Sequence, residues 1–139
     1  MFKTFVTNRL VKSEDLNHHG TLYAGRTAEW LVESAFVAAG SVLPSNSIVC
    51  KKIHGLTFLK PVKPGQIVCF NSRLVYGGKS SLRVYVKVNL IHLIEELYVE
   101  GFVTFIHVND KTEPVPHNIK ITPETDEEKE LYERAANAK

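Results

Sequence analysis

The feature that most constrains the fold is one long helical segment followed by four strand-like runs with short turns between them. Residues 20–40 (GTLYAGRTAEWLVESAFVAAG) are rich in Ala, Leu, Trp and Glu, and Gly40 closes the segment before Pro44. The turns between the later runs are short enough for antiparallel neighbours. The β-rich runs lie at residues 2–12, 48–59, 66–76, 81–91 and 97–108.

A chain with one long helix and five strands has few ways to bury its apolar surfaces. The helix and one face of the sheet are both covered if the sheet wraps around the helix. The sequence therefore predicts an α+β fold, in which an antiparallel five-stranded sheet surrounds one central helix. The acidic segment 123–139, with Pro123 near its start, predicts a short C-terminal helix. We expect residues 1–122 to form the main domain and this helix to pack on it or extend from it.

Length and composition exclude several other classes of protein. The chain has 139 residues, 44% of them hydrophobic and 23% charged, as is typical of one globular domain. No apolar run approaches the roughly 20 residues that span a bilayer, and residues 1–9 do not resemble a signal peptide. Cys50 and Cys69 lack metal-ligand spacing and the density of a disulfide framework, so we expect two buried thiols. These observations favour a cytoplasmic location and no membrane partner.

The net charge of +2 is unevenly distributed along the chain. The last sixteen residues hold six acids and three bases, a charge of −3, and the rest holds fourteen bases and nine acids, a charge of +5. Four lysines cluster at residues 51–63, which suits either a small phosphorylated ligand or a solvated basic face. We expect no nucleic acid partner, because a dense basic stripe is missing. The scattered histidines predict no metal and no cofactor.

One side of the long helical segment carries small apolar residues, and the other side is mixed. At 100° per residue, Ala35 and Ala39 fall on the apolar side, which allows a sheet to approach closely. The opposite side carries Glu29, Trp30 and Glu33, together with Arg26 and Val37. The two carboxylates either pair with Arg26 on an exposed stripe or face a cleft or a partner subunit.

Several motifs resemble those of one enzyme family. Residues 17–25 (NHHGTLYAG) and 30–35 (WLVESA) are similar to the N-x-x-G-T-L-(H/F)-G-G and W-(M/L)-D-E-A signatures of hotdog-fold acyl-CoA thioesterases. The resemblance points to the 4-hydroxybenzoyl-CoA thioesterase-like superfamily, in its broad acyl-CoA hydrolase branch. Further segments agree in order, at residues 58–68 (FLKPVKPGQIV), 75–82 (VYGGKSSL), 101–105 (GFVTF) and 114–116 (PVP).

The resemblance implies a homo-oligomer that hydrolyses acyl-CoA or another acyl thioester. In this family the sheet wraps the long helix, two subunits join their sheets edge to edge, and the substrate lies in the groove between them. We therefore expect a dimer or a higher assembly, a tetramer or a hexamer. Tyr23, Ala24 and Gly25 align with the helix start, whose backbone amides polarise the thioester carbonyl, with Ala24 as oxyanion donor. A helix carboxylate acts as general base or nucleophile, and Asn17 holds the water or the substrate.

The sequence departs from the family pattern at the catalytic carboxylate. Val32 stands where the family has its Asp, and Glu33 stands at the neighbouring acid. Glu33 takes the catalytic role if the helix contains one extra residue, for example in a π-bulge. Glu29 is the competing candidate. Thr21, Glu29 and His54 also resemble, loosely, the Thr/Glu/His set of fluoroacetyl-CoA thioesterases on the same fold.

Other polar residues are candidates for binding the substrate. His19 lies on the loop before the helix and either binds the thioester or braces the loop, and Lys60 belongs to the basic cluster. Lys79, Ser80 and Ser81 form either a simple hairpin turn or a set of donors for the phosphates of CoA.

The leading prediction of function is an acyl-CoA thioesterase. The alternatives are a non-catalytic acyl-CoA binding or sensing protein, which Val32 favours, and a thioester hydratase. The hydratase is disfavoured because the H-F-P-x-x-P-x-x-P-G segment of such dehydratases is missing.

Overall fold

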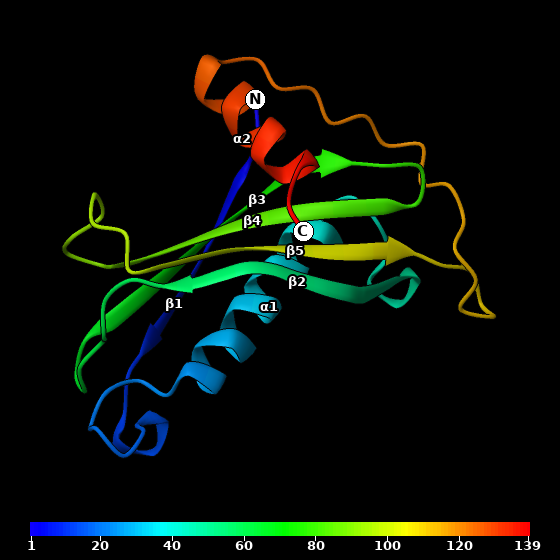
Figure 1. Ribbon diagram of the computed structural model, residues 1–139. Coiled ribbons are helices and arrows are strands. Elements are labelled where there is room, and N and C mark those ends of the chain that lie inside the picture. The colour runs from blue at the N-terminus through cyan, green and yellow to red at the C-terminus, as the bar shows by residue number, and fades with distance from the viewer.

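The computed structural model describes all residues, 1–139, and contains one antiparallel sheet and two α-helices (Figure 1). The strand order is β1-β3-β4-β5-β2, so β1 and β2 form the two edges. The elements are β1 (Thr4–Leu10), η1 (Ser13–Asp15), α1 (Ala24–Gly40), η2 (Ser45–Ser47), β2 (Ile48–Phe58), β3 (Ile67–Gly77), β4 (Ser81–Leu90), β5 (Val99–His107) and α2 (Asp126–Ala136), where η1 and η2 are short 3₁₀ turns. Neither α-helix is long and apolar enough to cross a membrane.

The sheet curves around α1, which lies against its inner face (Figure 1). Leu31, Ala35, Ala38 and Ala39 are fully buried there, and the small alanines let the backbone of the helix come close to the strands. Successive side chains of a strand point to opposite faces of the sheet. The paired residues Val84 and Val103 lie in the main core, and the next pair, Tyr85 and Phe102, lies in the smaller apolar cluster. This arrangement confirms the predicted α+β fold, with five antiparallel strands around one long helix.

The long helix begins later than the sequence pattern predicts. Residues 20–23 are not helical, because Leu22 forms an isolated bridge with Leu16 and its N–H donates to the carbonyl of Val62 at 2.8 Å. The helix starts at Ala24 and ends at Gly40. The C-terminal helix likewise starts after Pro123, at Asp126, because Thr125 caps it by accepting the N–H of Glu128 at 3.1 Å.

The mixed side of the helix is not a uniformly exposed stripe, and one prediction of burial is wrong. Trp30, on that mixed side, is only 6% exposed and packs edge-on against Phe70 with 6.2 Å between ring centroids. The half-exposed guanidinium of Arg9 lies 5.4 Å from the centroid of the Trp30 ring. Cys69 is buried, but Cys50 is exposed because it lies on the edge strand β2.

The C-terminal helix lies on the outer face of the sheet, opposite α1 (Figure 1). Leu131 and Ala135 pack with Tyr85 and Phe102 of the sheet and with Phe2 in a second, smaller apolar cluster. This contact buries the narrow apolar stripe of α2 and leaves its acidic side in solvent.

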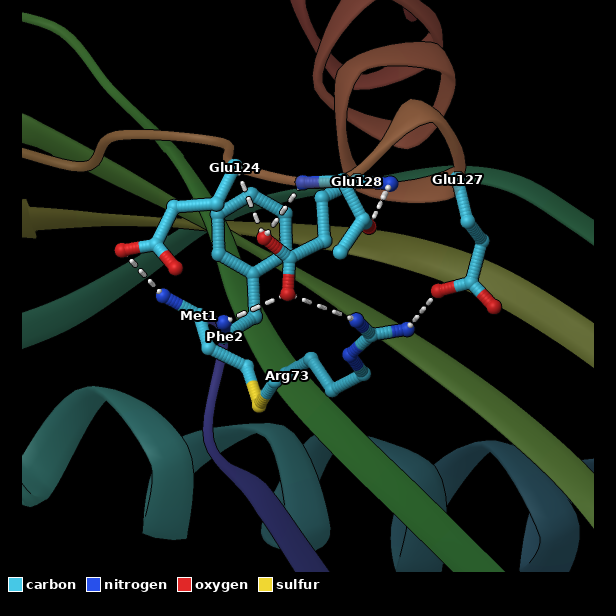
Figure 2. A network of polar contacts seen from close by, with 7 residues as sticks. Met1, Phe2, Arg73, Glu124, Glu127 and Glu128 are labelled. Atoms are coloured by element: carbon cyan, nitrogen blue, oxygen red, sulfur yellow. Dashed lines mark hydrogen bonds and ion pairs between the residues drawn. The ribbon is translucent and has the colours of Figure 1, made fainter.

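A buried carboxylate ties the start of the chain to α2. Glu128 is 2% exposed and accepts the N–H of Phe2 and the N–H of Glu124, each at 2.9 Å (Figure 2). The backbone hydrogen bonds from Glu124 and Phe2 lower the pKa of Glu128 below its ordinary value. Arg73 bridges Glu127 at 2.9 Å and Glu128 at 3.6 Å. The N-terminal segment and α2 are therefore held together on the sheet.

Candidate active site

The start of α1 presents backbone donors that the helix itself does not use. The first amide N–H groups of a helix have no intrahelical acceptor, and the side chain of the N-cap residue Tyr23 makes no capping bond here. The N–H of Ala24 is the first of these groups. Together with the positive end of the helix dipole, they favour a negatively charged oxygen at this point.

A tight loop holds Asn17 beside this helix start. The Asn17 side-chain oxygen accepts the N–H groups of His19 at 2.8 Å and Thr21 at 3.2 Å, and its amide nitrogen donates to the Thr21 hydroxyl at 3.1 Å. Gly20 closes the loop with φ of 78°, which a residue with a side chain rarely adopts. Asn17 thus braces the loop, and its NH₂ group still has a second N–H available.

A cavity of about 280 Å³ opens at the start of α1. Asn17, Ala24 and Lys60 all line it, so the structure brings together three of the residues predicted from the sequence. The ammonium group of Lys60 pairs with Glu96 and lies 5.6 Å from the centroid of the Tyr98 ring. The remaining walls come from Leu22, Thr27, Phe58, Leu59, Pro61, Val62 and Val99 and are mainly apolar.

Tyr23 and Gly25 lie at the rim of this helix start. A Cβ atom on Gly25 would come within 2.5 Å of the Tyr23 ring, so the tyrosine folds back over the glycine. The side chain of Tyr23 is otherwise exposed, as is His19 on the preceding loop, whose ring contacts that of His18 at a tilt of 41° with 4.0 Å between centroids. None of Tyr23, Gly25 and His19 lines the cavity.

Asp15, which is not among the site residues predicted from the sequence, positions the start of α1. Asp15 is only 4% exposed, and its side chain accepts the N–H of Lys12 at 2.9 Å and pairs with Arg26 Nε at 3.2 Å. Its backbone carbonyl accepts the N–H of Tyr23 at 2.8 Å. Asp15 therefore connects the η1 turn to the first turn of the helix. The Lys12-to-Asp15 spacing is a signal for the turn, but no local pattern indicates the contacts with Tyr23 and Arg26.

Neither candidate carboxylate of α1 lies in the cavity. The Glu33 side chain is 60% exposed and pairs with Arg9 of β1, and the Glu29 side chain is 62% exposed and lies 3.8 Å from Arg26. The predicted pairing with Arg26 is therefore confirmed for Glu29 and wrong for Glu33. At about 1.5 Å and 100° per residue, Glu33 lies roughly 13 Å along the axis from Ala24 and on the opposite side of the helix.

The hypothesis of an extra helical residue is wrong. The helix α1 is α-helical throughout, without a π-turn that would rotate Glu33 into the place of Val32. Val32 itself is half-buried and packs against the core.

The Thr/Glu/His set is not formed. His54 lies on the outer face of the sheet, where its Nε2 is 2.7 Å from the Thr104 hydroxyl, while Glu29 projects from α1 beneath the inner face. Burial is the larger cause that lowers the pKa of His54, and the positive charge of Arg83 lowers it further.

The Lys79–Ser81 turn lies at the other end of the sheet. The cavity includes Val99, which pairs with Val88, whereas the turn follows Gly77, which pairs with Leu82. The seven steps from Val88 to Ser81 span roughly 24 Å along β4. One chain therefore does not bring this turn and the helix start into one pocket. No three His, Cys, Asp or Glu side chains come together as a metal-binding group.

Comparison with known proteins agrees with this architecture. A structure described as an apo-hexameric acyl-CoA thioesterase superposes with a TM-score of 0.84 at 30% identity, covering 96% of this chain and 86% of that one. The Staphylococcus aureus acyl-CoA hydrolase in complex with butyryl-CoA and CoA superposes with a TM-score of 0.82 at 29% identity, covering 96% and 82%. The protein therefore has the hotdog fold of these thioesterases.

The sequence comparisons define the family. The family model of the thioesterase superfamily matches residues 19–90. A Bacillus subtilis protein named as an uncharacterized acyl-CoA thioester hydrolase is 32% identical over 124 residues, which cover 87% of this chain and 71% of that protein. The chain belongs to the thioesterase superfamily. It spans about a third of the rat and mouse cytosolic acyl-CoA thioester hydrolases that it also matches.

Proposed function

We propose that this protein is an acyl-CoA thioester hydrolase, which releases a free acid and CoA. The observation that carries the proposal is the uncapped start of α1, where Ala24 and Asn17 open into one apolar-walled cavity. Membership of the thioesterase superfamily and the resemblance to named acyl-CoA thioester hydrolases support the choice of substrate class.

In this proposal the Ala24 N–H stabilises the oxyanion that develops on the thioester carbonyl. A preorganised amide at a helix N-terminus needs no reorganisation when the charge appears, and the apolar walls keep the local dielectric low. The free N–H of Asn17 orients the attacking water or the substrate. Tyr23 and Gly25 shape the rim over which the thioester passes.

The base or nucleophile is Glu33 in this proposal, now as an exposed group offered to a second chain and not as a group rotated by an extra helical residue, with Glu29 as the second candidate. Both carboxylates are exposed on the single chain and accessible to a second one. Because Glu33 lies roughly 13 Å along the axis from Ala24 and does not line the cavity, we infer that the two residues serve different sites of an oligomer. A complete site then combines the helix start of one chain with the carboxylate of another.

The groups that bind the CoA moiety would likewise come from two chains. In this proposal Lys60, with His19 from the loop before the helix, binds the pantetheine or phosphate groups of a ligand in the cavity. Lys79, Ser80 and Ser81 lie too far along β4 and would contact the phosphates only from a second chain. The hexameric assembly of the similar thioesterase structure supports a homo-oligomer of this kind.

The test is thiol release from a series of acyl-CoA esters by the wild type, Glu33→Gln and Glu29→Gln. Loss of a general base lowers kcat by about 10²- to 10⁴-fold. The exposed acid Glu130 on α2 supplies the matched control, Glu130→Gln, which should keep full turnover. If only Glu29→Gln is inactive, the assignment of Glu33 is wrong while the activity stands.

A second candidate function is acyl-CoA binding without hydrolysis, which the half-buried Val32 at the family's Asp position favours. Calorimetry separates the two functions. A wild type that binds CoA esters but releases no thiol at any chain length is a binding protein, and the proposed hydrolase activity is then refuted.

A further inference from the structure

A second cavity, of about 430 Å³, lies at the opposite end of α1 from the candidate active site. It is formed by the beginning of the chain, the turn after α1, and the segment 119–124 that leads to α2. It shares no lining residue with the cavity at Ala24. Its apolar wall consists of Phe2, Phe5, Val42, Leu74, Ile119 and Ile121.

The buried network around Glu128 fixes two walls of this cavity. The backbone N–H groups of Phe2 and Glu124 both donate to the Glu128 carboxylate, so the chain start and the 119–124 segment are held in place (Figure 2). The amino group of Met1 pairs with Glu124 at 2.9 Å across the same cavity wall. The cavity is therefore already formed before any ligand binds.

The charged groups that line the cavity are predominantly basic. Lys3 and Lys120 are exposed and form no ion pair within the chain. Lys3 Nζ lies 5.2 Å from the centroid of the Phe5 ring, so its charge is held beside the apolar wall. The one carboxylate, Glu124, is neutralised by the amino group of Met1.

The helix end indicates where an anion would lie. The C-terminus of a helix carries partial negative charge and disfavours anions. At the end of α1, the carbonyls of Ala38 and Ala39 accept the N–H groups of Ser41 and Val42. The lining residues at this helix end, Ser41 and Val42, carry no positive charge. An anionic head group therefore belongs on the side of Lys3 and Lys120, and an aliphatic chain belongs against Phe5, Val42 and the other apolar residues.

We propose that this cavity binds a free alkyl carboxylate of medium length, a fatty acid, with its chain on the apolar wall and its carboxylate within reach of Lys3 and Lys120. This ligand matches both the apolar lining and the unpaired basic charge. The site does not depend on the proposed hydrolase activity, although a fatty acid is also the kind of product that such activity releases.

Calorimetric titration with hexanoate, octanoate and decanoate tests the site. Each buried methylene should tighten binding by up to about fourfold, until the cavity is filled. The double variant Lys3→Glu, Lys120→Glu should weaken binding by at least about tenfold, because it reverses both charges at the head group. The control Lys111→Glu, Lys129→Glu changes the net charge equally at exposed lysines that do not line the cavity, and it should bind as the wild type does.

A second variant tests the apolar wall with both lysines retained. Val42→Phe fills the cavity and should abolish decanoate binding, whereas Val6→Phe, at an exposed valine outside it, should not. Thiol release by Val42→Phe should equal that of the wild type, so failure of the site and failure of the hydrolase activity are distinguishable.

Three results would overturn the proposal. Decyltrimethylammonium binding as tightly as decanoate would show that the lysines do not select the head group. Binding that survives Val42→Phe would place the ligand elsewhere. A change in mass by light scattering for Val42→Phe, but not for Val6→Phe, would assign this surface to a contact between copies of the chain.

Discussion

Replacing Ala24 with proline separates the proposed oxyanion donor from the helix that carries it. Ala24 is the first residue of α1, a position at which proline is favoured because the N–H has no partner in the helix. The preceding residue, Tyr23, has φ of −65° and ψ of 130°, which is the extended conformation that a following proline requires. The substitution therefore removes one N–H group and leaves the start of the helix in place.

The expected effects on turnover and stability differ in size. Removing one oxyanion donor lowers kcat by about 10²- to 10³-fold, or about 3–4 kcal/mol in the barrier. The free energy of unfolding should change by less than about 1 kcal/mol, because proline at a compatible position mainly restricts the unfolded chain. The assay is thiol release from butyryl-CoA, paired with urea unfolding followed by the fluorescence of Trp30, the single and buried tryptophan.

The control is Ala24→Gly, which keeps the amide and should retain kcat within a few-fold. If Ala24→Pro turns over within about threefold of the wild type, the Ala24 N–H is not the oxyanion donor. If the Gly variant loses as much activity as the Pro variant, the methyl group or the backbone rigidity matters rather than the N–H. Either result refutes the assignment.

Three further predictions concern the structure around the site. Asp15→Ala leaves the Lys12 N–H without its acceptor and should lower the free energy of unfolding by about 2–3 kcal/mol in urea titration, whereas the exposed Glu14→Ala should change it by less than about 0.5 kcal/mol. Leu31→Ala should cost about 2–5 kcal/mol because the side chain is fully buried in the core, and this is contradicted if the exposed Val37→Ala costs as much. The pKa of Glu128 is lowered in the folded state, so its charge stabilises the fold fully above the unfolded pKa, and this stabilisation is lost as the pH falls through the folded pKa. The difference in urea midpoint between wild type and Glu128→Gln should therefore become smaller from pH 7 to pH 3. A difference that stays constant over this range would refute the contribution of the charge.

The fold was predictable because its signals are local. The helix at Ala24–Gly40 has a small apolar stripe, and the short connections β3–β4 and β4–β5 join antiparallel neighbours as expected. The connection from β2 to β3 does not, because β2 pairs with β5 at the opposite edge of the sheet. Composition alone places the start of the helix too early, at residue 20, because the residues before Ala24 are held by Val62 and Asp15, whereas the family resemblance places it correctly at Tyr23–Gly25. The burial of Trp30 did not follow from its side of the helix, because a helical wheel gives the direction of a side chain and ignores its reach.

The site was predictable only in part, for the same reason. Asn17 and Ala24 lie close together in the sequence, and the loop and helix start that join them follow from that segment alone. The partner of Glu33 was missed because Arg9 lies 24 residues away, on a strand rather than on the helix. The contact of Glu128 with Phe2 spans 126 residues. Contacts of this separation depend on the sheet being assembled, so the charge pattern of one segment does not indicate them.

The edge strand β1 and the residues just before it make these two distant contacts, and this bears on how two chains can meet. Arg9 near one end of β1 pairs with Glu33 of α1, and Phe2, just before its other end, donates to Glu128 of α2. Helices on both faces of the sheet thus depend on β1. Both edges carry exposed apolar side chains, Val6 and Leu10 on β1 and Val49, Ile53 and Phe58 on β2, but of these only Phe58 also lines the cavity at Ala24. An unpaired edge with apolar side chains favours pairing with another strand. We therefore expect two chains to associate through β2, which preserves the contacts of β1 and places the second chain next to the cavity that a single chain leaves without a carboxylate.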